Sequence, residues 1–227
     1  MLKKIIKNKG VLLIGFICCV ICLCCIARQI GYKNAPISTE MTLEELEKQN
    51  IRVQYVDEAE GCTDEYFEDF VQEQIEEAEN CPNILLVKPT EQIYFNKDMV
   101  LQQVEVKQVI KGKCSYDKVW ITNGLSSSLS YNGTDVILSG MERSFMQTDC
   151  EYLLFCNASY VNKYSDKKIY SEAENMWIGC FNVTRDCVTT VEGDLCYYNP
   201  AIEYYSTNKK LLNSYMETKH SLIDKYL

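Results

Sequence analysis

The sequence contains a single histidine, His220, close to its C-terminal end. A Ser-His-Asp or Cys-His catalytic centre would have to use this residue, and a histidine on a terminal helix is most often simply exposed. A zinc site needs cysteine and histidine ligands at close spacing. Beyond residue 28 the two nearest cysteines are Cys150 and Cys156, with no histidine near them. We therefore predict that the chain is not an enzyme and holds no metal and no cofactor.

The sequence also lacks phosphate-binding loops, nucleotide-binding glycine motifs, internal repeats and low-complexity tracts. Basic residues are in deficit, because 23 lysines and arginines stand against 32 aspartates and glutamates, for a formal net charge of −9. Binding to nucleic acid depends on a basic surface that neutralises phosphates. Nucleic acid is therefore excluded as the expected partner.

What the sequence does contain is an uncharged apolar stretch of seventeen residues, Val11 to Ala27. As a helix it would cover ~26 Å, at the lower end of what crosses a hydrocarbon core of ~30 Å. Only Arg28 and Lys33 follow it closely, whereas four lysines precede it: Lys3, Lys4, Lys7 and Lys9. This asymmetry favours a cytoplasmic N-terminus. We predict a cytoplasmic tail over 1–10, a transmembrane signal-anchor over 11–27, a linker over 28–39 and a domain outside the cytoplasm, on a single-pass protein of the cell membrane.

A cleaved signal peptide is the alternative for the same stretch. Cys25-Ile26-Ala27 is a small-x-small triplet that suits cleavage after export. The apolar stretch is slightly longer than the ~7–15 residues of a typical signal-peptide core, which favours the anchor. Cleavage would make the protein secreted rather than anchored.

The thirteen cysteines divide into two groups. Five lie in the apolar stretch, and eight lie beyond it: Cys62, Cys81, Cys114, Cys150, Cys156, Cys180, Cys187 and Cys196. An even number of cysteines beyond a membrane segment predicts disulfide bonds in an oxidising compartment. Their pairing is left open, with two exceptions. Cys62 and Cys81 would stand ~28 Å apart at the two ends of a helix and cannot join. Cys150 and Cys156 would stand ~20 Å apart on one strand and also need other partners.

Acidic residues are concentrated in one segment, because residues 40–80 hold fifteen acids and two bases. Thr42-Leu43-Glu44-Glu45 forms a capping box that predicts a short helix to about Lys48. The alternation of Ile51, Val53 and Tyr55 with polar neighbours predicts a brief strand. We treat residues 40–81 as an acidic helical segment.

A longer helix is predicted over residues 63–80, with Thr63 as its N-cap. One face is apolar, since residues recur at spacings of three and four: Phe67, Phe70, Val71, Ile75 and Ala78. The opposite face is nearly all carboxylate, and it is the predicted interaction face: Asp64, Glu65, Glu68, Asp69, Glu73, Glu76 and Glu77. Calcium loops alternate their ligands around a glycine turn, which this segment lacks. The face is therefore interpreted as a solvated surface or as a docking surface for a basic partner.

From Pro82 onward the pattern changes to short strands. They are predicted at 83–88, 100–110, 119–121, 135–138, 152–156, 176–183 and 188–191, with a turn at Lys111-Gly112 and a polar loop over Ser126–Ser130. Strands at this spacing predict a small barrel or sandwich over 82–198. A helix is predicted over 199–227, with Pro200 in its first turn and Leu211, Tyr215, Leu222 and Tyr226 on one face.

Three segments carry a resemblance to a known family. They are Val104-Glu105-Val106-Lys107-Gln108-Val109-Ile110-Lys111-Gly112, Val119-Trp120-Ile121 and Glu151-Tyr152-Leu153-Leu154-Phe155. Their order resembles the netrin/metalloproteinase-inhibitor type of OB-like barrel, and in particular membrane-attached bacterial versions of unknown role. In that family a long strand ends in a Lys-Gly turn, and a later strand has tyrosine followed by apolar residues. The resemblance implies a mainly β fold with flanking helices, built on a small OB-like β-barrel.

Inhibitory members of that family place a Cys-x-Cys at the mature N-terminus, where it reaches a protease zinc. Cys22-Leu23-Cys24 has this spelling but lies inside the apolar stretch, so inhibition is not carried over. The sequence thus predicts a disulfide-stabilised binding module that meets an unknown protein or envelope component through the acidic helix and the loop at Gly124–Ser130. The alternatives are a protease-inhibitor-like domain and an enzyme with an unrecognised pair of carboxylates.

Overall fold

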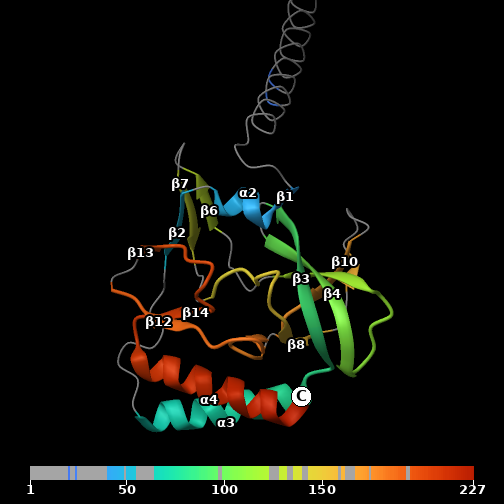
Figure 1. Ribbon diagram of the computed structural model, residues 1–227, viewed down its shortest axis with the longest axis vertical. Helices are drawn as coiled ribbons and strands as arrows, with labels where there is room; N and C mark the ends of the chain where they lie inside the picture. Colours follow the sequence, from blue (N-terminus) through green and yellow to red (C-terminus); the bar gives the residue numbers. More distant parts are fainter. Residues whose placement is uncertain are drawn as a thin grey trace, which may run out of the picture. The chain divides into compact units, whose positions relative to one another are not determined.

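Figure 1 shows the computed structural model of the chain. The structure describes Val20, Cys24 and residues 40–227, with gaps at 49, 55–63, 97–98, 123–127, 132–134, 140–142, 158–159, 162–166, 174 and 193–194. The chain divides into two units, Met1–Ser38 and Thr39–Leu227. The predicted membrane segment over 11–27, apart from Val20 and Cys24, and the linker over 28–39 lie outside the described residues. Among the helices that are described, none is long and apolar enough to cross a membrane.

The larger sheet has eight strands and is built on a long antiparallel hairpin of β3 (Asn83–Asn96) and β4 (Met99–Lys111) (Figure 1). Its order is β11-β8-β3-β4-β5-β10-β9, and β1 pairs with the far end of β3. The other strands are β1 (Glu40–Thr42), β5 (Lys118–Thr122), β8 (Tyr152–Cys156), β9 (Tyr160–Val161), β10 (Lys168–Ser171) and β11 (Cys180–Asn182). All pairs are antiparallel except β5 with β10.

This sheet does not close into a barrel in the described part of the chain, so the prediction of a closed barrel is wrong there. The two ends of its path, β11 and β9, have three and two residues, and no pairing joins them. Closure requires tilted strands that stay paired all the way around. The strand predicted over 176–183 is shorter than expected, since only Cys180–Asn182 pairs with β8.

The described part of the chain also forms two smaller sheets. The first has the order β13-β2-β7-β6 and consists of β2 (Asn50–Gln54), β6 (Ser128–Tyr131), β7 (Asp135–Ser139) and β13 (Leu195–Tyr197). In the second, β12 (Val188–Thr190) runs parallel to β14 (Tyr204–Ser206). The brief strand predicted near residue 51 is confirmed as β2. The prediction of a polar loop over 126–130 is wrong for residues 128–130, because they belong to β6, which pairs with β7.

Three helices flank the sheets. In α2 (Leu43–Glu47) the predicted capping box is present, with the Glu45 amide donating to Thr42 Oγ1 at 3.1 Å and the Thr42 amide donating to Glu45 Oε2 at 2.8 Å. The acidic helix is confirmed as α3 (Asp64–Asn80). It packs against the C-terminal helix α4 (Lys209–Tyr226), and the two lie side by side (Figure 1).

The predicted start of the C-terminal helix is wrong by about two and a half turns, because α4 begins at Lys209 rather than near Pro200. The N-cap is Asn208, whose side chain accepts from the amides of Lys210 and Leu211. Pro200 lies in a turn before β14 instead. Between these two residues the chain forms β14 instead of a helix. Tyr204 and Tyr205 of this strand pair with β12 and are 0% and 2% exposed.

The larger sheet is covered on both faces. Ile84 on β3 and Phe155 on β8 face a core cluster that includes Leu212 and Tyr215 of α4. Their neighbours in sequence, Leu85 and Leu154, face a second cluster on the opposite side. This two-sided burial explains why β8 reads as a continuous apolar run rather than as an alternating one. The mainly β class with flanking helices is confirmed.

Candidate functional site

The helix α3 presents two different faces. Phe67, Val71, Gln74 and Ala78 are buried. Asp69, Glu73 and Glu76 are exposed and follow one another at spacings of four and three, which places them along one stripe of the helix. We call these three residues the carboxylate face of α3.

The C-terminal half of α3 is held in place by polar contacts from other elements. The Trp177 amide donates to Gln74 Oε1 at 2.7 Å, and Asn175 Nδ2 donates to Glu77 Oε2 at 3.1 Å. Glu79 forms an ion pair with Lys225 of α4, while its backbone carbonyl accepts from Lys111 Nζ at 2.6 Å. The cations therefore meet the negative end of the helix, where they are stabilising.

The predicted interaction face is only partly realised as a surface. Glu77 is half-buried and bonded to Asn175, so it belongs to the packing of α3 rather than to its open side. The remaining predicted residues, Asp64, Glu65 and Glu68, lie in α3, but their side chains are outside what the structure describes. The second predicted contact region, Gly124–Ser130, is described only for the backbone of residues 128–130.

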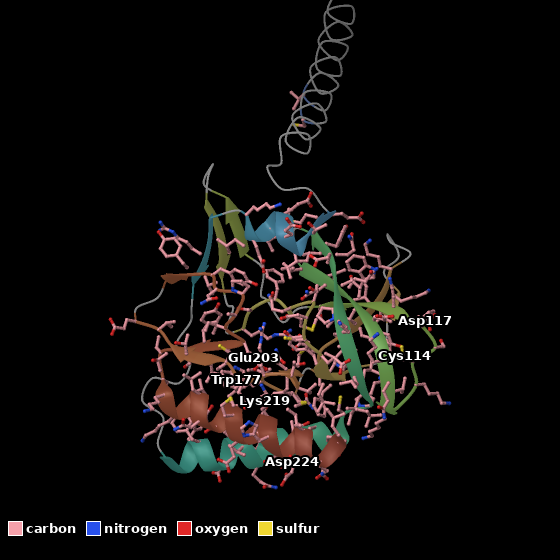
Figure 2. All side chains as sticks on the ribbon, in the orientation of Figure 1. Cys114, Asp117, Trp177, Glu203, Lys219 and Asp224 are labelled. Carbon is pink, nitrogen blue, oxygen red and sulfur yellow. The ribbon has the colours of Figure 1, made fainter. Side chains whose placement is uncertain are left out.

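A network of charges ties α4 to the segments that precede β12 and β14, and Figure 2 labels its two buried members, Glu203 and Lys219. Lys219 on α4 is 1% exposed, and its Nζ donates to Glu203 Oε2 at 2.6 Å, to Asp186 Oδ1 at 2.8 Å and to the Arg185 carbonyl at 2.8 Å. Glu203 Oε1 also accepts from the Tyr215 hydroxyl at 2.6 Å. All three ammonium protons thus have acceptors, and the lysine is structural.

The pKa values of the two carboxylates in this network shift in opposite directions. Burial raises the pKa of Glu203, although the hydrogen bonds from Lys219, Tyr215 and the Asn182 amide oppose the rise. Asp186 is half-exposed; burial acts to raise its pKa, but hydrogen bonds from Lys219 and His220 outweigh this and lower it. His220, the single histidine, is exposed and lies 2.9 Å from Asp186 Oδ2.

A second buried ion pair joins Arg143 to Glu172. A small cavity beside Arg143 is lined by Tyr152, Cys180, Asn182 and Glu203. The volume within which the centre of a water molecule can lie is about 10 Å³. That is room for about one water molecule. This cavity is too small for a substrate, and the groups around it serve to pack the core.

An open hollow of about 570 Å³ lies beside the end of β4. It is lined by Val109, Gly112, Lys113, Cys114, Ser115, Tyr116 and Tyr170. Gly112 has φ +84°, which favours glycine, and an added Cβ would collide with the Pro82 carbonyl. Among the described residues its lining contains no carboxylate and no imidazole.

Six of the predicted disulfide cysteines are described as free thiols. Cys81, Cys150, Cys156 and Cys180 are buried, while Cys114 and Cys187 are half-buried. Burial raises the pKa of the Cys180 thiol to about 12 and also raises that of Cys156, which favours the protonated form of both thiols. Cys62 and the side chain of Cys196 lie outside the described residues, and the disulfide framework stays a prediction.

No metal centre is formed by the part of the chain that the structure describes, since no three His, Cys, Asp or Glu residues there are placed to hold an ion. The sequence reasoning missed both buried ion pairs. The signal for Glu203 was its position between Ile202 and Tyr204, because a carboxylate flanked by apolar residues is a candidate for a buried, partnered group.

No model of a known protein family matches the chain, and no curated protein matches it significantly. The class that the fold and surfaces define is a mainly β domain with two packed helices, one of which presents the carboxylate face.

Proposed function

We propose that this chain is a single-pass, membrane-anchored binding module that works outside the cytoplasm and meets a basic partner through the carboxylate face of α3. The partner is a basic protein or an envelope component. The anchor is the apolar stretch over 11–27, and the lysines before it support a cytoplasmic N-terminus.

The observation that carries the proposal is how α3 is mounted. Its apolar face is buried, and its C-terminal half is fixed by Gln74, Glu77 and Glu79. The carboxylate face is thereby held outward on a rigid element. Like charges four residues apart on a helix cost a few tenths of a kcal/mol, so they are unfavourable unless a cation meets them.

Two further parts of the proposal rest on the sequence. The OB-like or netrin-like kinship is supported by the fact that the three resembling segments fall on β4, β5 and β8 of one sheet. The disulfide framework is supported by the eight cysteines beyond the apolar stretch. Both features suit a domain exposed to an oxidising compartment.

The test compares two variants of equal net charge. In the first, Asp69→Asn, Glu73→Gln and Glu76→Gln neutralise the carboxylate face. In the matched control, Glu91→Gln, Asp117→Asn and Glu192→Gln neutralise three exposed acids elsewhere in the domain. The immobilised full-length proteins are incubated with a solubilised envelope fraction, and captured proteins are quantified at low and high salt.

We expect the first variant alone to lose capture, and we expect capture by the natural chain to fall with salt because the screening length shrinks from ~10 Å at 0.1 M to ~3 Å at 1 M. Equal loss of capture in the control variant, or capture that does not change with salt concentration, would contradict the role of α3.

The position of the anchor is tested separately, by N-terminal sequencing of the mature protein. An intact N-terminus supports the anchor, a start after Ala27 gives a secreted protein, and a start at Cys22 revives the protease-inhibitor-like alternative.

A further inference from the structure

A lysine side chain is enclosed by two aromatic rings and a carboxylate on the larger sheet. Lys167 Nζ lies 4.3 Å from the ring centroid of Trp120 and 4.8 Å from that of Tyr94. It also lies 2.9 Å from Glu40 Oε1. The side chain of Lys167 is 15% exposed, although lysine is among the residues that are most often solvated.

The three groups around the ammonium come from separate strands. Glu40 of β1 is paired with Tyr94 of β3, and Trp120 lies on β5, with β4 between β3 and β5. The two rings meet edge to face, with centroids 6.4 Å apart and an interplanar angle of 73°. The neighbours of Trp120 in sequence, Val119 and Ile121, are fully buried, so Trp120 points to the other side of the strand. The arrangement is therefore carried by the sheet itself.

The chemistry of this arrangement selects a primary ammonium group. Two ring faces within ~6 Å of a cation attract it through their quadrupoles, which is how aromatic cages hold ammonium ligands. Rings alone would accept a quaternary ammonium equally well. Glu40 adds a hydrogen-bond acceptor, which a quaternary ammonium cannot use because it has no N–H. A lysine side chain satisfies all three groups.

We propose that Glu40, Tyr94 and Trp120 form a binding site for the primary ammonium group of a lysine side chain, that Lys167 of the same chain fills it in this structure, and that a lysine from a partner polypeptide binds there by displacing Lys167. We call these three residues the ammonium cage. The site goes beyond the carboxylate face of α3 and depends neither on that face nor on the membrane anchor.

Displacement of Lys167 requires little rearrangement of the sheet. Lys167 lies just before β10, whose pairing with β5 begins at Ile169. The strand on the other side, β9, pairs with only Lys168 and Ile169 in the described register. Rotation of the lysine side chain out of the ammonium cage therefore does not require the β5–β10 pairing to break. A site occupied by its own chain binds an outside ligand more weakly, in proportion to the fraction of time that it is empty.

The neighbouring lysine offers a matched control. Lys168 Nζ lies over one ring, Tyr116, at the longer distance of 5.6 Å. Removal of Lys168 deletes the same charge one residue away but does not empty the ammonium cage.

The test uses the full-length protein and n-pentylamine, which reproduces the end of a lysine side chain. Binding is followed by NMR of the indole N–H signals, of which the chain has two, from Trp120 and Trp177. Trp120→Phe assigns the signal of Trp120. We expect Lys167→Ala to lower the half-saturating concentration of pentylamine at the Trp120 signal by ~10-fold or more relative to the natural chain. Lys168→Ala should behave like the natural chain.

A second arm tests the selectivity. In Lys167→Ala, pentyltrimethylammonium should bind more weakly than pentylamine, and addition of Glu40→Ala, which removes the acceptor, should abolish that preference. Lys167→Gln, which keeps a polar side chain one atom shorter than lysine and without the charge, provides a second emptied variant should Lys167→Ala fail to give the native Trp177 signal. The proposal is overturned if neither emptied variant binds pentylamine more tightly than the natural chain, or if Lys168→Ala tightens binding equally. Neither outcome bears on capture through the carboxylate face.

Discussion

Two charged regions of this molecule are built in opposite ways. The carboxylate face of α3 consists of exposed like charges set by neighbouring positions on one helix. The network around Lys219 consists of opposite charges in direct contact, with Lys219 and Glu203 buried and Asp186 half-exposed, and its members come from three separate stretches of the chain. Water screens the first region, whereas the second depends on direct contacts. The comparison teaches that charge density in the sequence does not identify the charges on which the fold depends.

The largest effect is expected from breaking the buried network. Lys219→Met should lower the free energy of unfolding by ~3–5 kcal/mol, because it leaves Glu203 buried with its charge uncompensated. The measurement is urea unfolding of the full-length protein. The double variant Lys219→Met/Glu203→Gln removes both charges and should regain much of that loss. A double variant that is no more stable than the single one would show that burial of the Glu203 charge is not the cause.

A smaller loss is expected from one hydrogen bond to the same carboxylate. Tyr215→Phe removes the hydroxyl that donates to Glu203 Oε1 but keeps the ring, which stacks on Tyr204 at 4.5 Å. Hydrogen bonds to charged groups contribute ~1.5–3 kcal/mol, and we expect a loss in that range. Tyr226→Phe is the control, since its ring contact with Phe155 is equally preserved. Equal losses of unfolding free energy in both variants would mean that the hydrogen bond to Glu203 does not stabilise the fold more than an ordinary tyrosine hydroxyl does.

The two carboxylates that share Lys219 should respond to pH in opposite directions. The pKa of Asp186 is lowered from the ordinary value of 3.8, so its contribution is present above that value and is lost as pH falls through the folded-state pKa. The pKa of Glu203 is raised from 4.5, so the folded state holds its proton more tightly, and stability falls as pH rises through the interval above 4.5.

Difference measurements separate these two titrations. The stability of the natural chain relative to Asp186→Asn should decline as the pH is lowered below about 3.8, while its stability relative to Glu203→Gln should decline as the pH is raised above about 4.5. Unfolding in urea across this range provides the values. Parallel pH profiles for the two variants would refute the assignment of opposite shifts.

The same contrast explains what the sequence could and could not predict. The capping box at Thr42 and the helix α3 depend on residues three and four positions apart in the sequence, and both are found where they were predicted. The start of α4 was misplaced because the choice between Pro200 and Asn208 depends on whether Tyr204 and Tyr205 can pair with β12, a contact between distant residues.

Closure of the sheet was beyond prediction for the same reason. Hydrophobic alternation identifies β4, β5 and β8 but not whether the two ends of their sheet meet. The ammonium cage was equally hidden, since Glu40, Tyr94 and Trp120 lie far apart in the sequence and converge only through strand pairing. Within the candidate site, helical periodicity predicted only the carboxylate face. It did not predict that Glu77 would be bonded to Asn175.

The smallest expected effect has the opposite sign and completes the comparison. Asp69 and Glu73 are like charges four residues apart on an exposed stripe, so Glu73→Gln should raise the free energy of unfolding by ~0.2–0.5 kcal/mol. The gain should shrink in high salt, because screening removes the repulsion that the variant relieves. Glu217→Gln on the exposed side of α4 is the control for loss of one negative charge from the domain. A destabilised Glu73→Gln would mean that Glu73 has a favourable contact in the folded chain, and the carboxylate face would then be part of the fold rather than a surface available to a partner.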